Sequence, residues 1–396
     1  MTRDASAAGP PEGLCLVAAR RTPQGRFLGA LKEFGPVELA CAAAGAALDD
    51  LGRPAIDAAI DQVIVGNVLG AGHGMNIARQ IGVRLGLPVT VPACTVNMMC
   101  GSGLEAMRLA ALAIRGGGAT TVLCGGTESM STAAYLVPRV RQGLKLGDAT
   151  LVDSILRDGL VDAFDHRHMA LQAEELGRRF DISRDAQDAW AVASQQRHAA
   201  AAAAGRFADE LVTTGGLAAD EHPRPGTNAV DLAKLKPAFA PDGTVTAGNA
   251  SGINDGAAVV VMTTLDRAAR EGWPVLCRWL DATTVGCAPD GMGLGPVHAL
   301  RALAARQAFA IDALDAVEIN EAFAAQMLAC AAELRLDPAR VNADGGAIAV
   351  GHPIGASGAR LAVHLARQIA RNEIRQAAAA LCVGGGMGIA CLLRAA

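Results

Sequence analysis

Two cysteines and one histidine of this sequence stand in turns that are unusually rich in glycine. Cys100 lies in VNMMCGSG, His352 in GGAIAVGHPIGASG and Cys382 in LCVGGGMG. So much glycine does not suit the interior of a helix or strand and indicates a backbone shaped around a ligand. Two thiols and an imidazole in such turns suggest covalent thiol chemistry.

Cys100 stands directly before a segment with helical spacing of apolar residues, which glycines 116–118 end. At a helix start, free backbone N–H groups and the positive end of the helix dipole favour a thiolate and lower the pKa of a thiol. Cys100 is therefore a candidate nucleophile. The alternative is a small buried apolar residue, which is the usual role of a free cysteine.

Cys382 leaves a predicted buried strand and meets the run Gly384-Gly385-Gly386. Glycines with free N–H groups form a site that stabilises anions, and a thiol beside it can exchange a proton with a carbanion or enolate. A cysteine on a buried strand is otherwise inert. His352 likewise has two interpretations, a structural histidine or a catalytic base.

Asn320, in the segment EINEAFAAQ, follows a short apolar run and precedes a helical one. It could cap that helix. Alternatively, its amide could hold a water molecule directed at a developing oxyanion. Two thiols, an imidazole and an amide, each at a glycine turn or helix start, favour a catalytic interpretation of the set.

Composition excludes several classes of function. The 396 residues carry a net charge of -4 and only 3% aromatic residues, so we expect no nucleic acid partner. The ten cysteines include no C-x-x-C pair, and residues 1–13 lack the apolar region of a secretory signal, which predicts a cytoplasmic protein with reduced thiols. The uncharged stretch 377–393 fits two strands and a tight turn better than a membrane helix.

The order of predicted elements indicates two similar α/β halves. Strands are expected at 14–19 and 62–68, with a helix at 36–51 between them. The starts CGSG at Cys100 and GASG at Gly355 match, as do LCGG at Leu123 and LCVGG at Leu381. Charged helical segments at 171–180 and 184–206 and the Pro/Gly-containing stretch 215–227 indicate an inserted, more exposed region between the halves.

These motifs resemble the thiolase family, of the acetyl-CoA acetyltransferase or 3-ketoacyl-CoA thiolase type. The resemblance covers nearly the whole chain, through RTPQGRFLGAL, VNMMCGSG, GNASGINDGA, NEAFAAQ, GGAIAVGHPIGASGAR and CVGGGMG. It implies an α/β fold with a duplicated five-layer αβαβα core and an inserted loop domain. The expected domains are an N-terminal half (1–130 and 253–274), a CoA-binding loop domain (131–252) and a C-terminal half (275–396).

The resemblance also implies residue roles. Cys100 corresponds to the acyl-accepting nucleophile and Cys382 to the acid/base. His352 would activate Cys100 and, with a water held by Asn320, form one oxyanion hole; the N–H groups of Cys100 and Gly384 would form the second. Contacts with CoA or the acyl group are implied at Ser251, Arg224, His168, Met169, Ala247, Met292 and Phe323.

The implied reaction is reversible Claisen condensation of acetyl-CoA with acyl-CoA, or thiolysis of a 3-oxoacyl-CoA in the other direction, through an acyl-cysteine. CoA is then a substrate, no metal or other cofactor is needed, and the expected assembly is a homodimer or homotetramer. Met98, where many relatives carry lysine, Ala170, where short-chain synthetic relatives carry glycine, and a shortened segment at 213–220 depart from the family pattern. These departures bear on which acyl chain the protein accepts and on how it binds CoA.

Three alternatives remain at this point. A ketoacyl synthase of the same fold would use a Cys-His-His arrangement, against which Cys382 in CVGGGMG argues. A catalytically silent acyl-CoA-binding relative would not need the four candidate residues. A dinucleotide-binding dehydrogenase is disfavoured because GAGHG at Gly70 lacks the G-x-G-x-x-G spacing.

Overall fold

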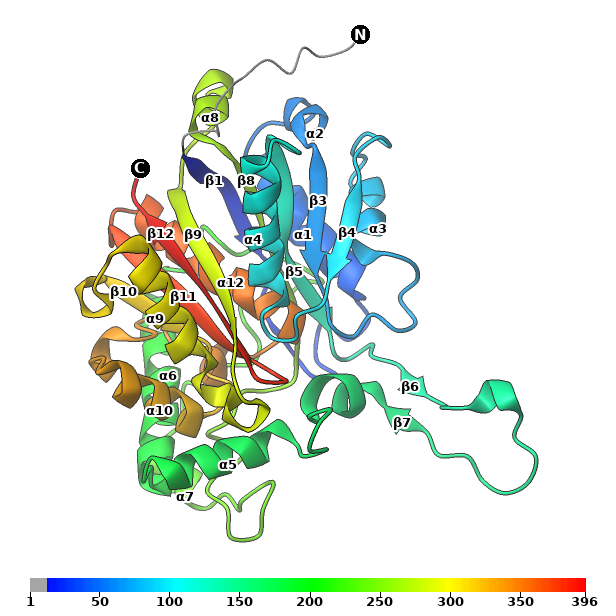
Figure 1. Ribbon diagram of the computed structural model, residues 1–396, viewed down its shortest axis with the longest axis vertical. Helices are drawn as coiled ribbons and strands as arrows, with labels where there is room; N and C mark the ends of the chain where they lie inside the picture. The colour runs from blue at the N-terminus through cyan, green and yellow to red at the C-terminus, as the bar shows by residue number, and fades with distance from the viewer. Residues whose placement is uncertain (1–12) are drawn as a thin grey trace.

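Nine strands form one continuous path of hydrogen-bonded neighbours in the computed structural model, which describes residues 13–396 (Figure 1). Residues 1–12, on which the expectation about a secretory signal chiefly rests, lie outside the described residues. The order along the path is β10 (Ala316–Ile319), β11 (Gln376–Val383), β12 (Met387–Arg394), β9 (Cys277–Gly286), β1 (Leu14–Arg21), β8 (Asn254–Thr264), β5 (Thr121–Ser129), β3 (Gln62–Gly66) and β4 (Ala93–Val96). The short strand β2 (Gly25–Arg26) pairs with β8 off this path.

The path consists of two copies of one arrangement. In the first copy β8 runs antiparallel to β1 and β5, and β3 runs parallel to β5 and β4. In the second, β12 runs antiparallel to β9 and β11, and β10 runs parallel to β11, with a parallel bridge from Val317 to Val341 in the place of the β3–β4 pairing. The copies join where Leu14–Leu16 pair with Cys277–Trp279. The predicted duplication is confirmed.

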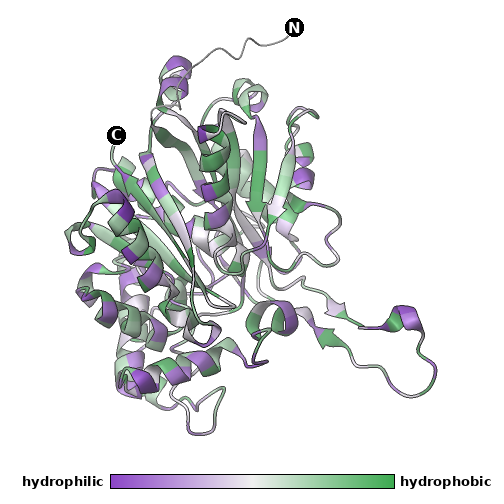
Figure 2. Ribbon diagram, in the orientation of Figure 1, coloured by the Kyte–Doolittle hydropathy of each residue, from purple (hydrophilic) through white to green (hydrophobic). Residues whose placement is uncertain are grey.

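Helices complete five layers. Helices α4 (Ser102–Arg115) and α12 (Ile354–Ala370) lie between the two copies and pack on strands of both. The outer face of the first copy is covered by α1 (Pro36–Asp49) and α3 (Ile77–Arg84), and that of the second by α9 (Gly295–Gln307) and α10 (Ala324–Leu334). Figure 2 shows apolar strands inside and polar residues on the outer helices. Burial of this apolar surface is the main force that holds the layers together.

Close approach of the two central helix starts requires the glycines of the repeated motifs. A Cβ atom on Gly103 would lie 2.8 Å from the carbonyl oxygen of Gly355, and one on Gly358 would lie 2.8 Å from the backbone nitrogen of Leu104. Both distances are too short for a real side chain, so only glycine lets α4 and α12 approach this closely. The segments that precede the two helices are thereby brought together.

The chain between β5 and β8 leaves the first copy and packs on the second. It contains a hairpin of β6 (Tyr135–Leu136) and β7 (Val152–Asp153) that extends away from the body, with a single 3-10 turn, η1 (Val140–Gln142), near its tip (Figure 1). It continues through a π-helix, η2 (Ile155–Leu160), and the helices α5 (Met169–Arg179), α6 (Arg184–Ala203) and α7 (Ala229–Ala233). Helix α5 packs on α10 and on η3 (Pro289–Leu294), and α6 packs on α10 and on α11 (Ala347–Val350). The remaining short elements are α2 (Ala55–Ala59), α8 (Leu265–Glu271), η4 (Ile311–Ala313) and η5 (Pro338–Arg340).

A buried ion cluster fastens this inserted segment to the core. Arg21 on β1 contacts Glu210 and Asp220, each with an N–O distance of 2.6 Å. His364 on α12 contacts Glu210 at 3.0 Å and Asp344 at 3.2 Å. Burial alone would lower the pKa of His364, but the carboxylates of Glu210 and Asp344 raise it to about 10. The imidazole is therefore charged at neutral pH.

Within residues 13–396, none of the helices combines the length and the apolar character needed to cross a membrane. The stretch 377–393 consists of β11, a glycine turn and β12, as predicted.

Candidate active site

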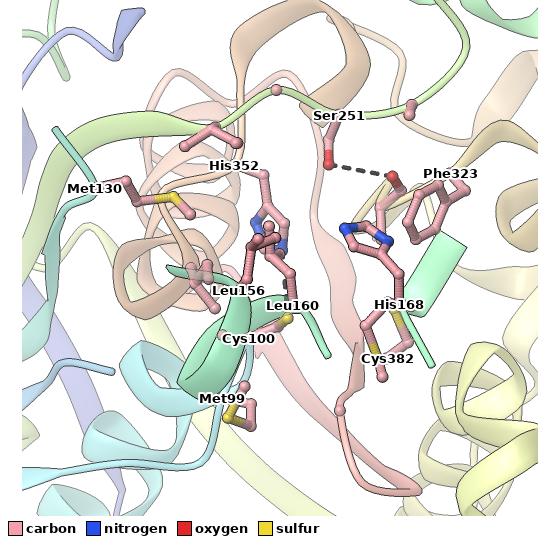
Figure 3. A pocket seen from close by; sticks show the side chains of 18 of the residues that line it. Met99, Cys100, Met130, Leu156, Leu160, His168, Ser251, Phe323, His352 and Cys382 are labelled. Carbon is pink, nitrogen blue, oxygen red and sulfur yellow. Dashed lines mark hydrogen bonds between the residues drawn. The ribbon is translucent and has the colours of Figure 1, made fainter. Parts of the chain in front are cut away.

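A cavity of about 290 Å³ opens between the two helix starts and the inserted segment (Figure 3). Its lining includes nine of the twelve site residues expected from the sequence. These are Cys100, His168, Met169, Ser251, Met292, Phe323, His352, Cys382 and Gly384. Asn320 contacts His352 directly behind the lining. Enclosed, mostly apolar cavities with a few converging polar groups are the usual form of a small-molecule site.

Cys100 is held in a turn between β4 and α4. Met99 adopts a left-handed backbone conformation, with φ of 47°, immediately before it. The hydroxyl of Ser102 donates to the Met99 carbonyl at 2.6 Å and accepts from the Met98 backbone N–H at 2.8 Å, which fixes the turn. The cysteine side chain thereby enters the cavity at the predicted helix start.

The sulfur of Cys100 lies 3.3 Å from Nε2 of His352, and Nδ2 of Asn320 lies 3.4 Å from the same nitrogen. In Figure 3 the imidazole points toward the Cys100 sulfur, and Cys382 stands across the cavity on the side of His168. The structure thus brings together a thiol, a base within reach of its proton, and an amide. This is the arrangement that activates a nucleophile.

The expected lowering of the Cys100 pKa is wrong. Burial raises the pKa of this thiol to about 11, although the backbone N–H groups of Cys100 and Gly384 act in the opposite direction. Burial also lowers the pKa of His352 to about 4, with a smaller contribution in the same direction from the charge of Arg360. Removal from water disfavours the charged form of both groups. For Cys100 this effect is larger than the lowering of the pKa expected from the helix start. At rest, the pair is a neutral thiol and a neutral imidazole.

His352 is positioned by the turn that precedes α12. Gly351 has φ of 109°, and a Cβ atom there would lie 2.5 Å from Cγ of Asn254, so glycine is required. The backbone N–H of His352 donates to Oδ1 of Asn254 at 2.9 Å. Its Nδ1 atom lies 2.5 Å from Oγ of Ser357, which is buried in the first turn of α12.

Asn320 does not cap a helix, so that alternative is wrong. It follows β10, and its backbone N–H donates to the Ala380 carbonyl at 3.0 Å. The helix begins only at Ala324, with Phe323 at the N-cap position. The pairing of Asn320 with the neighbouring strand turns its amide toward His352 and leaves Oδ1 buried without a partner among the described residues.

Cys382 and Gly384 lie at the end of β11 and in the turn to β12. Gly385 and Gly386 have φ of 84° and 83°, as a tight glycine turn requires. Burial raises the pKa of the Cys382 thiol well above its usual value, and the neighbouring Cys100 adds to this effect. Cys382 is therefore a protonated thiol at rest, and the backbone N–H of Gly384 is directed at the Cys100 sulfur.

The opposite wall carries most of the residues expected to contact CoA. The ring of His168 stacks on that of Phe239 with centroids 4.6 Å apart, and its Nδ1 atom accepts from the Ala170 backbone N–H at 3.1 Å at the start of α5. Ser251 Oγ donates to the Ala322 carbonyl at 3.1 Å. Arg224 and Ala247 are exposed and do not line the cavity.

No motif of the sequence indicated the apolar wall beside Cys100. The π-helix η2 contributes Leu156, Gly159 and Leu160 to the lining, and Met130 and Ile354 complete this wall. Apolar residues carry no chemical signal, and a π-helix has none of the periodicity by which helices are found. Phe239 was missed for the same reason.

Glu128 is a second residue that the motifs did not reveal. It is fully buried, and its carboxylate accepts from the backbone N–H groups of Val68, Leu69 and Gly355 at 3.1, 3.1 and 2.9 Å. Burial raises its pKa to about 7, although these donors act in the opposite direction. Glu128 therefore fixes the N-terminus of α12, and with it the His352 turn, against the first copy.

Comparison with known proteins assigns the chain to a family. The family models "Thiolase, N-terminal domain" and "Thiolase, C-terminal domain" match residues 14–266 and 273–395. The chain belongs to the thiolase family. The acetyl-CoA acetyltransferase of Pseudomonas aeruginosa is 47% identical over 391 residues, which cover 96% of this chain and 99% of that protein. The probable acetyl-CoA acetyltransferase of Escherichia coli K12 is 46% identical over 95% of this chain and 97% of its own length.

Solved thiolase structures show the same fold. Human mitochondrial 3-ketoacyl-CoA thiolase in complex with CoA superposes with a TM-score of 0.94 at 42% identity, over 97% of this chain and 98% of that one. The acetyl-CoA acetyltransferase of Bacillus anthracis superposes with a TM-score of 0.93 at 36% identity, over 98% of this chain and 100% of that one. The expected thiolase fold and acyltransferase activity are confirmed. In residues 13–396 we find no group of His, Cys, Asp and Glu arranged to hold a metal ion.

Proposed function

We propose that this thiolase works through an acyl group on Cys100, in reversible condensation of acetyl-CoA with an acyl-CoA and thiolysis of 3-oxoacyl-CoA. The observation that carries this proposal is the 3.3 Å contact between the Cys100 sulfur and Nε2 of His352 in a cavity that Cys382 also reaches. CoA is a substrate in thiolysis and a product in condensation, and no step calls for a metal or redox cofactor.

In thiolysis, Cys100 attacks the 3-keto carbonyl while its proton passes to Nε2 of His352. Because both groups are neutral at rest, this transfer accompanies formation of the carbon–sulfur bond. The protonated Nε2 then faces the developing oxyanion beside Asn320, and this is one oxyanion hole. Cleavage of the C2–C3 bond leaves the acyl group on Cys100 and the enolate of acetyl-CoA.

Cys382 protonates that enolate at C2, and the backbone N–H groups of Cys100 and Gly384 stabilise the thioester oxygen. The Cys382 thiolate next takes the proton of an incoming CoA thiol. The CoA thiolate attacks the acyl group, and the Cys100 sulfur regains its proton from His352. In condensation, each step runs in reverse, with Cys382 as the base at C2.

The inserted segment 131–252 is proposed as the CoA-binding loop domain, between an N-terminal half (1–130 and 253–274) and a C-terminal half (275–396). His168, Met169 and Ser251 would contact pantetheine, while Met292 and Phe323 would border the acyl group. All five lie in the cavity wall, which supports these roles. Arg224 and Ala247 would act outside the cavity, where the nucleotide of CoA leaves it.

We also infer a homodimer or homotetramer in the cytoplasm. Apolar side chains of the projecting hairpin support self-association, since Leu144, Leu146 and Leu151 are 60, 102 and 63% exposed in a single chain. The ten cysteines are all unpaired, as is usual in a reducing compartment.

The decisive experiment measures thiolysis of 3-oxoacyl-CoA together with mass spectrometry of the acyl-enzyme. The wild-type protein is expected to turn over and to carry the acyl group on Cys100. Cys100→Ser should carry none, because a serine hydroxyl stays protonated and is a poor nucleophile here. An adduct on another residue, or an inactive wild type that still binds acyl-CoA, would contradict the proposal; the second result would favour the silent relative.

A further inference from the structure

The repeated serines Ser102 and Ser357 occupy equivalent places in the two copies. Each lies in the first turn of a central helix, in the matching motifs CGSG and GASG. The hydroxyl of Ser102 donates to the Met99 carbonyl at 2.6 Å, and that of Ser357 is 2.9 Å from the Pro353 carbonyl. Both side chains are almost completely buried, with exposed fractions of 0 and 1%.

The second contact of each hydroxyl shows how the two differ. Ser102 Oγ accepts from the backbone N–H of Met98 at 2.8 Å, so its own hydrogen is donated to the Met99 carbonyl. In the other copy, the place of that N–H is taken by Nδ1 of His352, 2.5 Å from Ser357 Oγ.

We propose that Ser357 is a positioning residue that holds His352 in the tautomer with the hydrogen on Nδ1. This inference rests on the proposed role of His352 as the base for Cys100. A hydroxyl has a single hydrogen, and the Pro353 carbonyl can only accept. When Ser357 gives its hydrogen to that carbonyl, its oxygen can only accept from the imidazole, so Nδ1 carries the hydrogen.

The position of this hydrogen determines whether the other ring nitrogen, Nε2, can act as a base. With the hydrogen on Nδ1, Nε2 presents a lone pair to the Cys100 thiol at 3.3 Å and to the Asn320 amide at 3.4 Å, and both of these are donors. In the other tautomer, Nε2 would carry a hydrogen facing the Asn320 N–H and could not accept the thiol proton. With the Asn320 amide nitrogen facing the ring, only the first tautomer offers an acceptor to both donors and provides a base.

The duplication explains why a serine does this. In both copies a serine hydroxyl contacts a backbone carbonyl in the turn where a central helix begins. In the second copy, a ring nitrogen of His352 takes the place that a backbone N–H has in the first. Ser357 is thereby connected to the Cys100 sulfur through the imidazole of His352.

The test compares wild type with Ser357→Ala, in protein labelled with ¹⁵N-histidine. Magic-angle-spinning NMR identifies which ring nitrogen is protonated, and the His352 signals are assigned by their loss in His352→Ala. We expect Nδ1 to carry the hydrogen in the wild type, and a mixture of tautomers or the Nε2 form in Ser357→Ala. A wild type with the hydrogen on Nε2 overturns the inference.

Single-turnover acylation by acetyl-CoA provides the functional readout. Loss of one buried hydrogen-bond partner should slow acylation of Ser357→Ala by about 10- to 100-fold while the affinity for CoA stays the same. Ser357→Thr retains the hydroxyl and should recover most of the rate. Thr263→Val is the matched control, because it removes another fully buried hydroxyl bonded to a carbonyl, on β8, and should leave the rate unchanged.

An unchanged acylation rate in Ser357→Ala, with His352→Ala strongly impaired, contradicts this inference and leaves the proposed function intact. Normal acylation in His352→Ala contradicts the proposed role of His352 itself. The two failures are therefore distinguishable.

Discussion

Cys100 and His352, 252 residues apart in the chain, meet with 3.3 Å between Sγ and Nε2. Burial raises the pKa of the thiol to about 11 and lowers that of the imidazole to about 4. In many cysteine enzymes the resting pair is a thiolate and an imidazolium. In this thiolase both partners are uncharged until a carbonyl arrives.

Alkylation of Cys100 should therefore rise steadily with pH. Below a thiol pKa of about 11, the thiolate fraction grows about tenfold per pH unit, and no plateau should follow titration of His352. The rate of Cys100 modification by iodoacetamide, followed by mass spectrometry from about pH 6 to about pH 10, measures this. A plateau already reached below about pH 8 would indicate a resting ion pair instead.

Replacing His352 by alanine should impair both half-reactions. The imidazole takes the thiol proton and also faces the oxyanion, and loss of one such donor costs about 100-fold or more in rate. Acyl-enzyme formation and condensation are measured separately in the variant. His298→Ala is a suitable control because His298 is exposed and outside the cavity. Turnover close to that of the control would remove His352 from the mechanism.

Cys382→Ser should separate the two half-reactions. Acylation of Cys100 by acetyl-CoA uses Cys382 only to protonate the departing CoA thiolate, which is a stable anion, so acylation should continue at a reduced rate. Exchange of the C2 protons should stop, because a serine hydroxyl stays protonated near neutral pH and cannot act as the base. Deuterium exchange into acetyl-CoA in heavy water is followed beside acyl-enzyme formation. Persistent exchange would mean that another group is the base; loss of acylation would mean that Cys382 helps to build the nucleophile's site.

The ion cluster around His364 predicts how stability depends on pH. The folded pKa of about 10 exceeds the unfolded value near 6.5, so this contribution is complete below about pH 6.5 and disappears as the pH rises through about 10. The contribution of Glu210 to stability is lost at low pH rather than at high pH. Burial would raise its pKa, but Arg21 and His364 lower it to about 2, so its contribution is lost only in strong acid.

Urea unfolding at about pH 6, 8 and 10 should show a decrease in the free energy of unfolding on the order of a few kcal/mol for the wild type. His364→Gln should be less stable at pH 6 and should show a much weaker dependence on pH. His298→Gln, an exposed histidine, should retain the wild-type slope. Equal slopes in wild type and His364→Gln would contradict a charged His364 in the folded protein.

Much of the fold could be predicted because it depends on local patterns. The segment after Cys100 has helical spacing and ends at three glycines, and α4 follows it from Ser102 to Arg115. The repeat of CGSG and GASG predicted the duplication, because the same close approach of two helices requires the same glycines. The inserted region was indicated by its charged helices α5 and α6.

The site was less predictable in those properties that depend on the tertiary structure. The direction of the Cys100 pKa shift depends on how much water the cavity excludes. The position of Cys100 before a helix does not reveal this. The role of Asn320 depended on where α10 begins, three residues later than a capping role would need. The wall formed by Leu156 and Leu160 depends on a π-helix, and the exposure of Arg224 depends on the path of a long loop.

The two copies meet at their helix starts, and this has an evolutionary consequence. Two identical subunits related by a twofold axis would place the same residue before both helices, a thiol facing a thiol or an imidazole facing an imidazole. A single fused gene removes that constraint, since each copy can mutate alone. The asymmetry between the Cys100 turn and the His352 turn is thus chemistry that a symmetric pair of identical repeats could not contain.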